Sequence, residues 1–130
     1  MKQISVVTDN RSGVLAELSR ALAVRGVNIE SIDGEGARET GVISLTVDRY
    51  DEALLALQEA GFQAVSEDAL IIRLKDAPGA LARVAERFKS ENLNIKSLRF
   101  LRRDSGYALV TLVTEDNHRA RTLVDDLLVG

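Results

Sequence analysis

The stretch Asp76-Ala77-Pro78-Gly79-Ala80-Leu81 lies between an apolar run at residues 69–74 and a helical pattern that ends near residue 90. A related stretch, Asn10-Arg11-Ser12-Gly13-Val14-Leu15, stands earlier in the chain. Each is followed, one helix length later, by a strand-like segment that carries an asparagine, Asn28 or Asn94. The turn glycine and this asparagine both recur after 66 residues, so the sequence contains a two-fold internal repeat.

Each repeat predicts strands and helices in the order strand, helix, strand, strand, helix, strand. In the first repeat the expected strands are 4–8, 27–32, 42–47 and 62–65, with helices ending at Gly26 and Gly61. In the second, the strands are 69–74, 93–101 and 107–114, with helices over 78–90 and 117–128. Two right-handed β-α-β crossings in one antiparallel sheet predict a ferredoxin-like α+β fold with the helices on one face. We expect one domain over residues 1–67 and another over 68–130.

Several finer expectations follow from the pattern. The apolar stripes Leu15, Leu18, Leu22 and Leu81, Val84, Ala85, Phe88 are expected to be the buried faces of two helices. Residues 33–36, Asp-Gly-Glu-Gly, are interpreted as a loose strand end or turn, and the hairpin at 103–106 as one residue longer than its counterpart. The second unit is expected to lack its last strand, because the chain ends where that strand would begin. This would uncover the edge of strand 69–74 and favour a homodimer.

Composition narrows the classes of function. The 130 residues are 45% hydrophobic and 4% aromatic, which suits two small lobes that bury apolar faces against each other or a second chain. A net charge of −3 lacks the basic excess usual in nucleic-acid binders, and the absence of cysteine excludes disulfides and cysteine metal sites. No signal peptide or membrane-spanning run is found, so a cytoplasmic protein without membrane contact is expected.

The strand-to-helix turn is the strongest candidate site in each repeat. A helix start presents unpaired backbone N–H groups and the positive end of a dipole, which favour a carboxylate, and Gly13 and Gly79 leave room for its approach. Asn10 and Asp76, at the same repeat position, can accept hydrogen bonds from a ligand ammonium. The alternative interpretation is purely structural, with Asn10 and Asp76 as N-caps of their helices.

Asp-x-Pro-Gly-x-Leu, followed by a helix and Asn-Ile, resembles the ACT domain, and the chain resembles small tandem-ACT proteins over nearly its whole length. The first copy is similar to the serine-sensing ACT domain of phosphoglycerate dehydrogenases, with Ser12 in place of the usual proline and Thr8 in place of a histidine. The resemblance implies an amino-acid ligand between domains, at the turn of one and the second strand of its neighbour. It implicates Asn10, Ser12, Gly13, Val14, Leu15 and Asn28 in the first copy, and Asp76, Pro78, Gly79, Ala80, Leu81 and Asn94 in the second.

We therefore predict a non-catalytic regulatory protein, without cofactor or metal, that binds a small amino acid and alters its association with itself or a protein partner. The single histidine and the absence of a phosphate-binding loop or nucleophile elbow argue against an enzyme. One alternative is an ACT-type interaction module without a ligand. Another is RNA binding, since Gly106-Tyr107-Ala108-Leu109-Val110 partly matches an RNA-recognition signature but lacks its later aromatic residues.

The two turns are expected to differ in strength. Asp76 offers a carboxylate where Asn10 offers a neutral amide, and charge-assisted hydrogen bonds are about twice as strong as neutral ones. The sequence therefore predicts that a ligand ammonium is held more firmly by the second turn.

Overall fold

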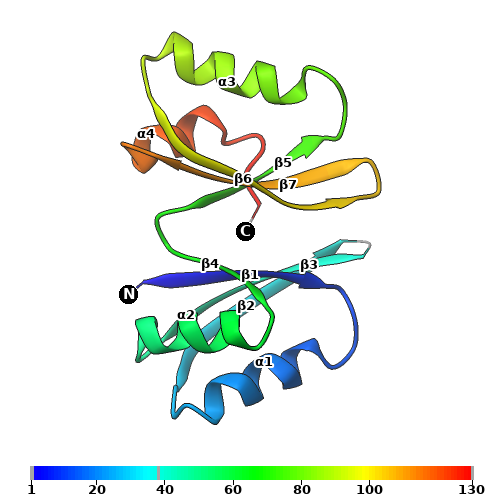
Figure 1. Ribbon diagram of the computed structural model, residues 1–130, viewed down its shortest axis with the longest axis vertical. Helices are drawn as coiled ribbons and strands as arrows, with labels where there is room; N and C mark the ends of the chain where they lie inside the picture. The colour runs from blue at the N-terminus through cyan, green and yellow to red at the C-terminus, as the bar shows by residue number, and fades with distance from the viewer. Residues whose placement is uncertain (1, 38, 130) are drawn as a thin grey trace. The chain divides into compact units, whose positions relative to one another are not determined.

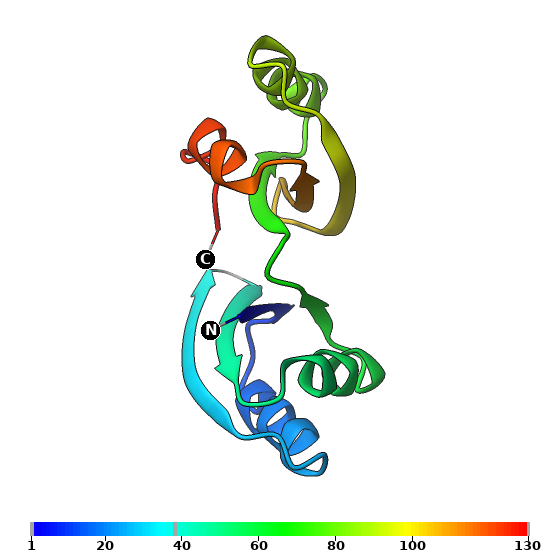
Figure 2. The same cartoon turned by 90° about the vertical axis from the view of Figure 1, so that its left-hand side faces the viewer.

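The computed structural model describes residues 2–37 and 39–129, which divide into two compact units, one up to Glu67 and the other Asp68–Val129. The first unit contains β1 (Gln3–Asp9), α1 (Val14–Ala23), β2 (Ile29–Ala37), β3 (Thr40–Val47), α2 (Tyr50–Glu59) and β4 (Gln63–Val65). The second contains β5 (Leu70–Lys75), α3 (Ala80–Ser90), β6 (Ile95–Asp104), β7 (Tyr107–Thr114) and α4 (Asn117–Leu123). Figures 1 and 2 show these elements from two directions.

The first unit is an antiparallel sheet in the order β2-β3-β1-β4, with α1 and α2 on one face (Figure 1). Its core forms between that face and the helices, where Ile4 and Leu45 from the sheet cluster with Leu18, Leu22 and Leu57. Ile4, Leu18, Leu22 and Leu57 have no exposed surface, which is the main source of stability in so small a unit.

The second unit repeats this plan, with β5-β7-β6 in the places of β1-β3-β2 and with α3 and α4 on one face. Its core gathers Ile72, Leu112 and Val124 around Phe88, which is 1% exposed. The predicted ferredoxin-like α+β fold is therefore confirmed in both units.

The C-terminal residues occupy the sheet edge that was expected to be bare. The second sheet has three strands in the described residues, yet Leu128 forms an antiparallel bridge with Ile72. The N–H of Arg73 donates to the Leu127 carbonyl at 2.9 Å, and the N–H of Val129 donates to the Ile71 carbonyl at 2.9 Å. The expectation of a helix to residue 128 was wrong, because α4 ends at Leu123 and the apolar side chains of residues 127 and 128 pack on the core. An uncovered β5 edge is therefore no reason for dimerisation.

The extra residue of the second unit lies in a strand and not in the hairpin. Both second strands shift register at their start, between Ile29 and Ser31 and between Ile95 and Ser97. Only the ladder of β6 with β7 shifts again, between residues 100 and 102. Leu101 is the additional residue of this β-bulge, which corrects the expectation of a longer hairpin.

Residues 33–36 are fully part of β2, which corrects the interpretation of this segment as a loose end. Gly34 pairs with Ile43 and Gly36 with Gly41, so the ladder continues to the hairpin. Because side chains alternate between faces, Gly34 and Gly36 lie on the same face as Ile43, which packs against the core. At this end of the sheet, β2 therefore has no side chain on that face.

The helix faces differ by one position from the predicted stripes. Val14 and Ala80, the first residues of α1 and α3, are buried, whereas Leu15 is 55% and Leu81 37% exposed. Ala85 is also exposed. The two leucines of the repeated motif are therefore available at the surface beside the turns.

Candidate functional site

Glycine is the N-cap of the first helix in each unit. Gly13 is the N-cap of α1 with φ 90°, and Gly79 is the N-cap of α3 with φ 84°, both in the left-handed region that favours glycine. Neither helix receives a side-chain cap. The interpretation of Asn10 and Asp76 as N-caps was therefore wrong. In α3, the first-turn N–H of Ala80 donates to the Ala77 carbonyl at 3.3 Å.

A backbone hydrogen bond holds each turn against the hairpin of its own unit. The N–H of Asn10 donates to the Glu39 carbonyl at 2.8 Å, and the N–H of Asp76 donates to the Gly106 carbonyl at 2.9 Å. These two bonds are equivalent in the repeat. They fix the residue after the first strand at the same place in both units, next to the end of the second strand.

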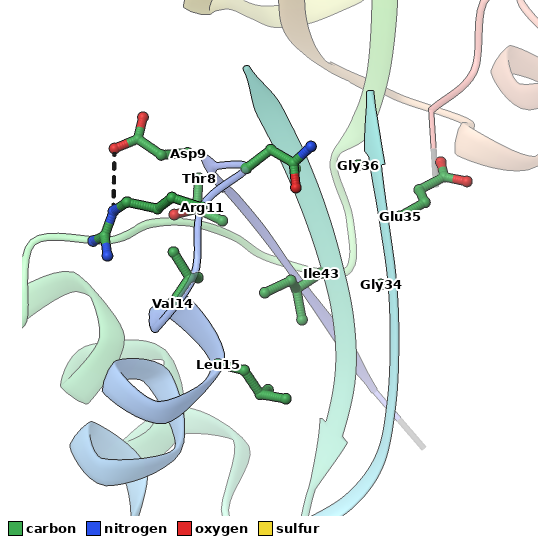
Figure 3. A pocket seen from close by; sticks show the side chains of 11 residues that line it. Thr8, Asp9, Arg11, Val14, Leu15, Gly34, Glu35, Gly36 and Ile43 are labelled. Carbon is green, nitrogen blue, oxygen red and sulfur yellow. Dashed lines mark ion pairs between the residues drawn. The ribbon is translucent and has the colours of Figure 1, made fainter. Parts of the chain in front are cut away.

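A cavity of about 260 Å³ opens at this place in the first unit (Figure 3). Its lining comes from the end of β1, the turn, the start of α1, and β2 and β3: Thr8, Asp9, Asn10, Arg11, Val14, Leu15, Gly34, Glu35, Gly36, Gly41 and Ile43. Pockets for drug-sized ligands usually measure about 300–1,000 Å³. The cavity is therefore of a size for a small metabolite.

Glycines make room for this cavity. Gly36 and Gly41 are paired across β2 and β3, and Gly34 lies two residues before Gly36 on the same face. A Cβ added to Gly36 would lie 2.5 Å from Oδ1 and 2.8 Å from Nδ2 of Asn10. Real Cβ atoms do not approach so closely, so the Asn10 amide occupies space that exists only because residue 36 is glycine.

The cavity combines an apolar wall with a polar mouth. Val14, Leu15 and Ile43 form the wall, and Figure 3 shows the Leu15 side chain directed toward β2 and β3. At the mouth, Nε of Arg11 lies 3.7 Å from Oδ2 of Asp9, and the two side chains form an ion pair. An apolar wall with a few polar groups is the usual arrangement of a small-molecule site.

The charge of Arg11 is already matched by acids of the same unit. Its Nη1 donates to Oε2 of Glu17 at 2.6 Å, and this hydrogen bond, followed by the charge of Glu17, raises the pKa of the guanidinium. Because Asp9 is also present, carboxylates outnumber guanidiniums at the mouth. An ammonium group is therefore favoured there, beside the amide of Asn10.

The equivalent place in the second unit is built from larger side chains. The β6–β7 ladder puts Phe100 opposite Val110 and Arg103 opposite Ala108, which are the positions of Gly34 and Gly36 in the first unit. Nε of Arg103 lies 3.2 Å from Oδ2 of Asp76, and its guanidinium lies 4.6 Å from the centre of the Phe100 ring. The carboxylate expected to hold a ligand ammonium thus has a cationic partner within the chain.

The predicted site residues separate into two groups within each unit. Asn10, Val14 and Leu15 line the cavity, and Ser12 and Gly13 belong to its turn without lining it. Asp76, Pro78, Gly79, Ala80 and Leu81 form the equivalent turn of the second unit.

Asn28 and Asn94 lie just before β2 and β6, at the other end of these strands from the turns. The N–H of Asn28 donates to Oδ1 of Asp48 at 2.9 Å, and the N–H of Asn94 donates to Oε1 of Glu115 at 3.3 Å. Within its own unit, Asn28 is not among the residues that line the cavity.

The sequence did not lead us to predict that residues of β2 and β3 line the cavity. Two glycines separated by one residue, Gly34 and Gly36, were a usable signal, because period-two glycines strip one face of a strand. The register that sets Gly41 beside Gly36 needs the three-dimensional structure.

Residues 2–37 and 39–129 contain no cluster of three or more His, Cys, Asp or Glu side chains arranged to hold a metal ion. Within the same ranges, no helix has the length and apolar character needed to cross a membrane.

The architecture is that of a paired ferredoxin-like protein with a ligand-sized cavity at the first strand-to-helix turn. A family model described as "ACT domain pair" matches residues 1–127, so the chain belongs to the family of ACT domain pairs. No curated protein matches the chain.

Several solved structures are similar to this chain over nearly its whole length. Protein BT0572 from Bacteroides thetaiotaomicron is 24% identical with a TM-score of 0.50, covering 98% of this chain and 90% of that one. The regulatory subunit of aspartate kinase from Thermus thermophilus is 21% identical with a TM-score of 0.46, covering 97% and 91%. The acetolactate synthase small subunit from Thermotoga maritima is 12% identical with a TM-score of 0.43, covering 99% and 89%.

Proposed function

We propose that this chain is a non-catalytic regulatory protein that binds a small amino acid in the cavity of its first unit. The observation that carries the proposal is the cavity itself, which joins a glycine-started helix to an acid-rich mouth. The amides of the helix start suit a carboxylate, and Asn10 with Asp9 suits an ammonium group. An amino acid carries both groups on one carbon atom.

Membership of the ACT family and the apolar wall both support a compact ligand. Val14, Leu15 and Ile43 can receive an aliphatic side chain, and the buried hydroxyl of Thr8 can serve a polar one. The similarity of the first copy to serine-sensing ACT domains makes L-serine the first ligand to test. Candidates with short or branched aliphatic side chains come next.

The regulatory output in this proposal is a change of association, either as a homodimer or with a protein partner. Sheet edges are the natural surfaces for such association. β2 and β6 are edge strands in their sheets, and both end beside the turns. Ligand binding beside β2 would alter the rigidity of that edge.

A thermal-shift panel of the twenty amino acids tests the proposal. Binding at about 100 times Kd adds about 2.7 kcal/mol to stability, which shifts the midpoint by several degrees for a chain of this size. The amide derivative of the best ligand, which lacks the carboxylate, should give a much smaller shift. Light scattering with and without that amino acid then measures the change of association.

The alternatives give different outcomes in the same panel. A flat response at millimolar concentration for all twenty amino acids would contradict the proposal and favour an interaction module without a ligand. A shift with single-stranded RNA alone would favour RNA binding. Leu109 and Leu112, which stand at aromatic positions of the RNA signature, are buried in β7.

A further inference from the structure

We propose that Arg103 acts as a built-in plug of the second turn, so that the chain binds one amino acid, in its first unit. The inference rests on the proposed function and adds to it which unit binds and which residue decides this. The first unit then provides the ligand site, and the equivalent place in the second unit is closed by the protein's own side chains.

The strand ladders make the correspondence position by position. Asn10 and Asp76 are equivalent in the repeat, and each is fixed by a backbone bond to the following hairpin. Gly36 and Arg103 are equivalent through their partners Gly41 and Ala108. The contact between Asn10 and Gly36 in the first unit therefore becomes the ion pair between Asp76 and Arg103 in the second.

Arg103 supplies to Asp76 what a ligand would otherwise supply. Its Nε lies 3.2 Å from Oδ2 and 3.3 Å from Oδ1 of Asp76, so a cationic N–H donor already faces the carboxylate. The Phe100 ring supports the guanidinium from 4.6 Å, within the range of a cation–π contact. A ligand ammonium would have to displace this donor.

The larger side chains of the second unit also reduce the space for a ligand at its turn. Gly34 leaves space in front of β2, with the nearest atom to an added Cβ being a side-chain carbon of Ile43 at 3.8 Å. The equivalent residue of the second unit is Phe100, a full aromatic ring that is 37% exposed. The ring and the guanidinium together occupy the side of the turn that the first unit leaves open.

The plug is weak enough to be removed by one substitution. The side chains of Arg103 and Asp76 are 60% and 40% exposed, and such ion pairs are held loosely in water. We expect the plug to weaken amino-acid binding by about tenfold, equivalent to about 1.4 kcal/mol. The fold of the second unit does not depend on it, because its core lies elsewhere.

Calorimetric titration of the whole chain tests the proposal, with the L-amino acid that gives the largest shift in the wild-type panel as probe. The wild type should bind one equivalent per chain at concentrations that saturate the first unit. Arg103→Ala should bind a second equivalent, or bind it about tenfold more tightly than the wild type does. Arg99→Ala, an exposed arginine on the same strand, is the matched control and should behave as the wild type.

A cysteine footprint assigns the equivalents to their units. The chain has no cysteine, so Leu15→Cys and Leu81→Cys each create a single thiol beside one turn. The probe amino acid should slow alkylation by iodoacetamide at position 15 in Leu15→Cys. At position 81 it should do so only when Arg103→Ala is also present.

The outcomes separate this inference from the proposed function. Two equal equivalents in the wild type would overturn the plug and leave amino-acid binding in place. An unchanged single equivalent in Arg103→Ala, without protection at position 81, would also overturn the plug. Absence of binding in both proteins would remove the proposed function, and the inference with it.

Discussion

The two units have the same strand-to-helix turn and differ in the residues of the strand beside it. Gly13 and Gly79 start α1 and α3 in the same left-handed conformation, and the turns before them are held by equivalent backbone bonds. Beside the turn, β2 has Gly34 and Gly36, whereas β6 has Phe100 and Arg103 at the equivalent positions. The backbone of the repeat forms this turn in both units. The side chains of the neighbouring strand decide whether space for a ligand remains beside it.

The sheet edges differ as well. In the first unit, β4 pairs with β1 over three residues, whereas in the second unit a single bridge at Leu128 replaces that strand. An ion pair supports the replacement, since Arg87 of α3 donates to both carboxylate oxygens of Asp126, at 2.6 and 3.1 Å. Arg87 also donates to the Leu123 carbonyl at 3.1 Å, which ties α3 to the end of α4.

The largest effect is expected from equivalent core positions. Leu22 and Phe88 are separated by the repeat spacing and are 0% and 1% exposed. Large-to-small core substitutions cost about 2–5 kcal/mol for leucine and about 3–5 kcal/mol for phenylalanine. Leu22→Ala and Phe88→Ala should therefore both lower the free energy of unfolding strongly in urea titrations.

Leu55→Ala is the control for this pair, because Leu55 is 48% exposed on α2. It should change stability by less than about 0.5 kcal/mol. If Phe88→Ala were as mild as this control, the second unit would not have the core described here, and the equivalence of the two units would fail.

The affinity for the amino acid should depend on which of the two glycines of β2 is replaced. In Gly36→Ala the new Cβ displaces the Asn10 side chain, which should weaken amino-acid binding about tenfold, as expected for losing one well-placed hydrogen bond. Gly34→Ala meets only Ile43, at an ordinary 3.8 Å, and should have a much smaller effect. Isothermal calorimetry on both variants makes the comparison, with equal affinities as the result that would argue against Asn10.

The C-terminal bridge should show a smaller effect on stability. Val129→Pro removes the N–H that donates to the Ile71 carbonyl, whereas Val129→Ala keeps it. The proline variant should be about 1 kcal/mol less stable than the alanine variant, the net value of one hydrogen bond. Light scattering should also show more self-association, because the β5 edge is freed. Identical stability of the two variants would mean that the bridge does not protect this edge.

The smallest expected effect is a change in the pH dependence of unfolding. The hydrogen bond from Arg87, and then its charge, lower the pKa of Asp126 below its ordinary value of 3.8. A lowered carboxyl pKa contributes stability above the ordinary value and loses it as the pH falls through the folded-state value. The stabilities of the wild type and Asp126→Asn should therefore converge in acid. A constant difference for Asp126→Asn would show that the ion pair is not formed in solution.

The sequence was sufficient to predict the repeated strand-to-helix turn, but not the strand residues that border it. The 66-residue spacing of Gly13 and Gly79 predicted the duplicated strand-to-helix turn, and both glycines adopt the left-handed conformation that favours this residue. The helical period left the buried face uncertain by one position, so Leu15 was expected to lie in the core. An extra residue is visible in the alignment of the repeats, but its place as a bulge at Leu101 depends on strand register.

The expectation that the second turn holds a ligand ammonium more firmly was based on the charge of Asp76 alone. A carboxylate at position 76 is a better ammonium acceptor than the amide at position 10 only if nothing in the chain pairs with it. Arg103 lies 27 residues further along the chain, and only the ladder of β6 with β7 shows that it reaches Asp76.

Intermolecular nuclear Overhauser effects from a bound, isotope-labelled amino acid to assigned methyl groups would show which unit holds the ligand. We expect cross-peaks to the methyls of Val14, Leu15 and Ile43, which line the cavity of the first unit. We expect none to Leu81, beside the turn that Arg103 closes, at a ligand concentration that fills one site. Cross-peaks to Leu81 with none to Leu15 would contradict the assignment of the open site to the first unit.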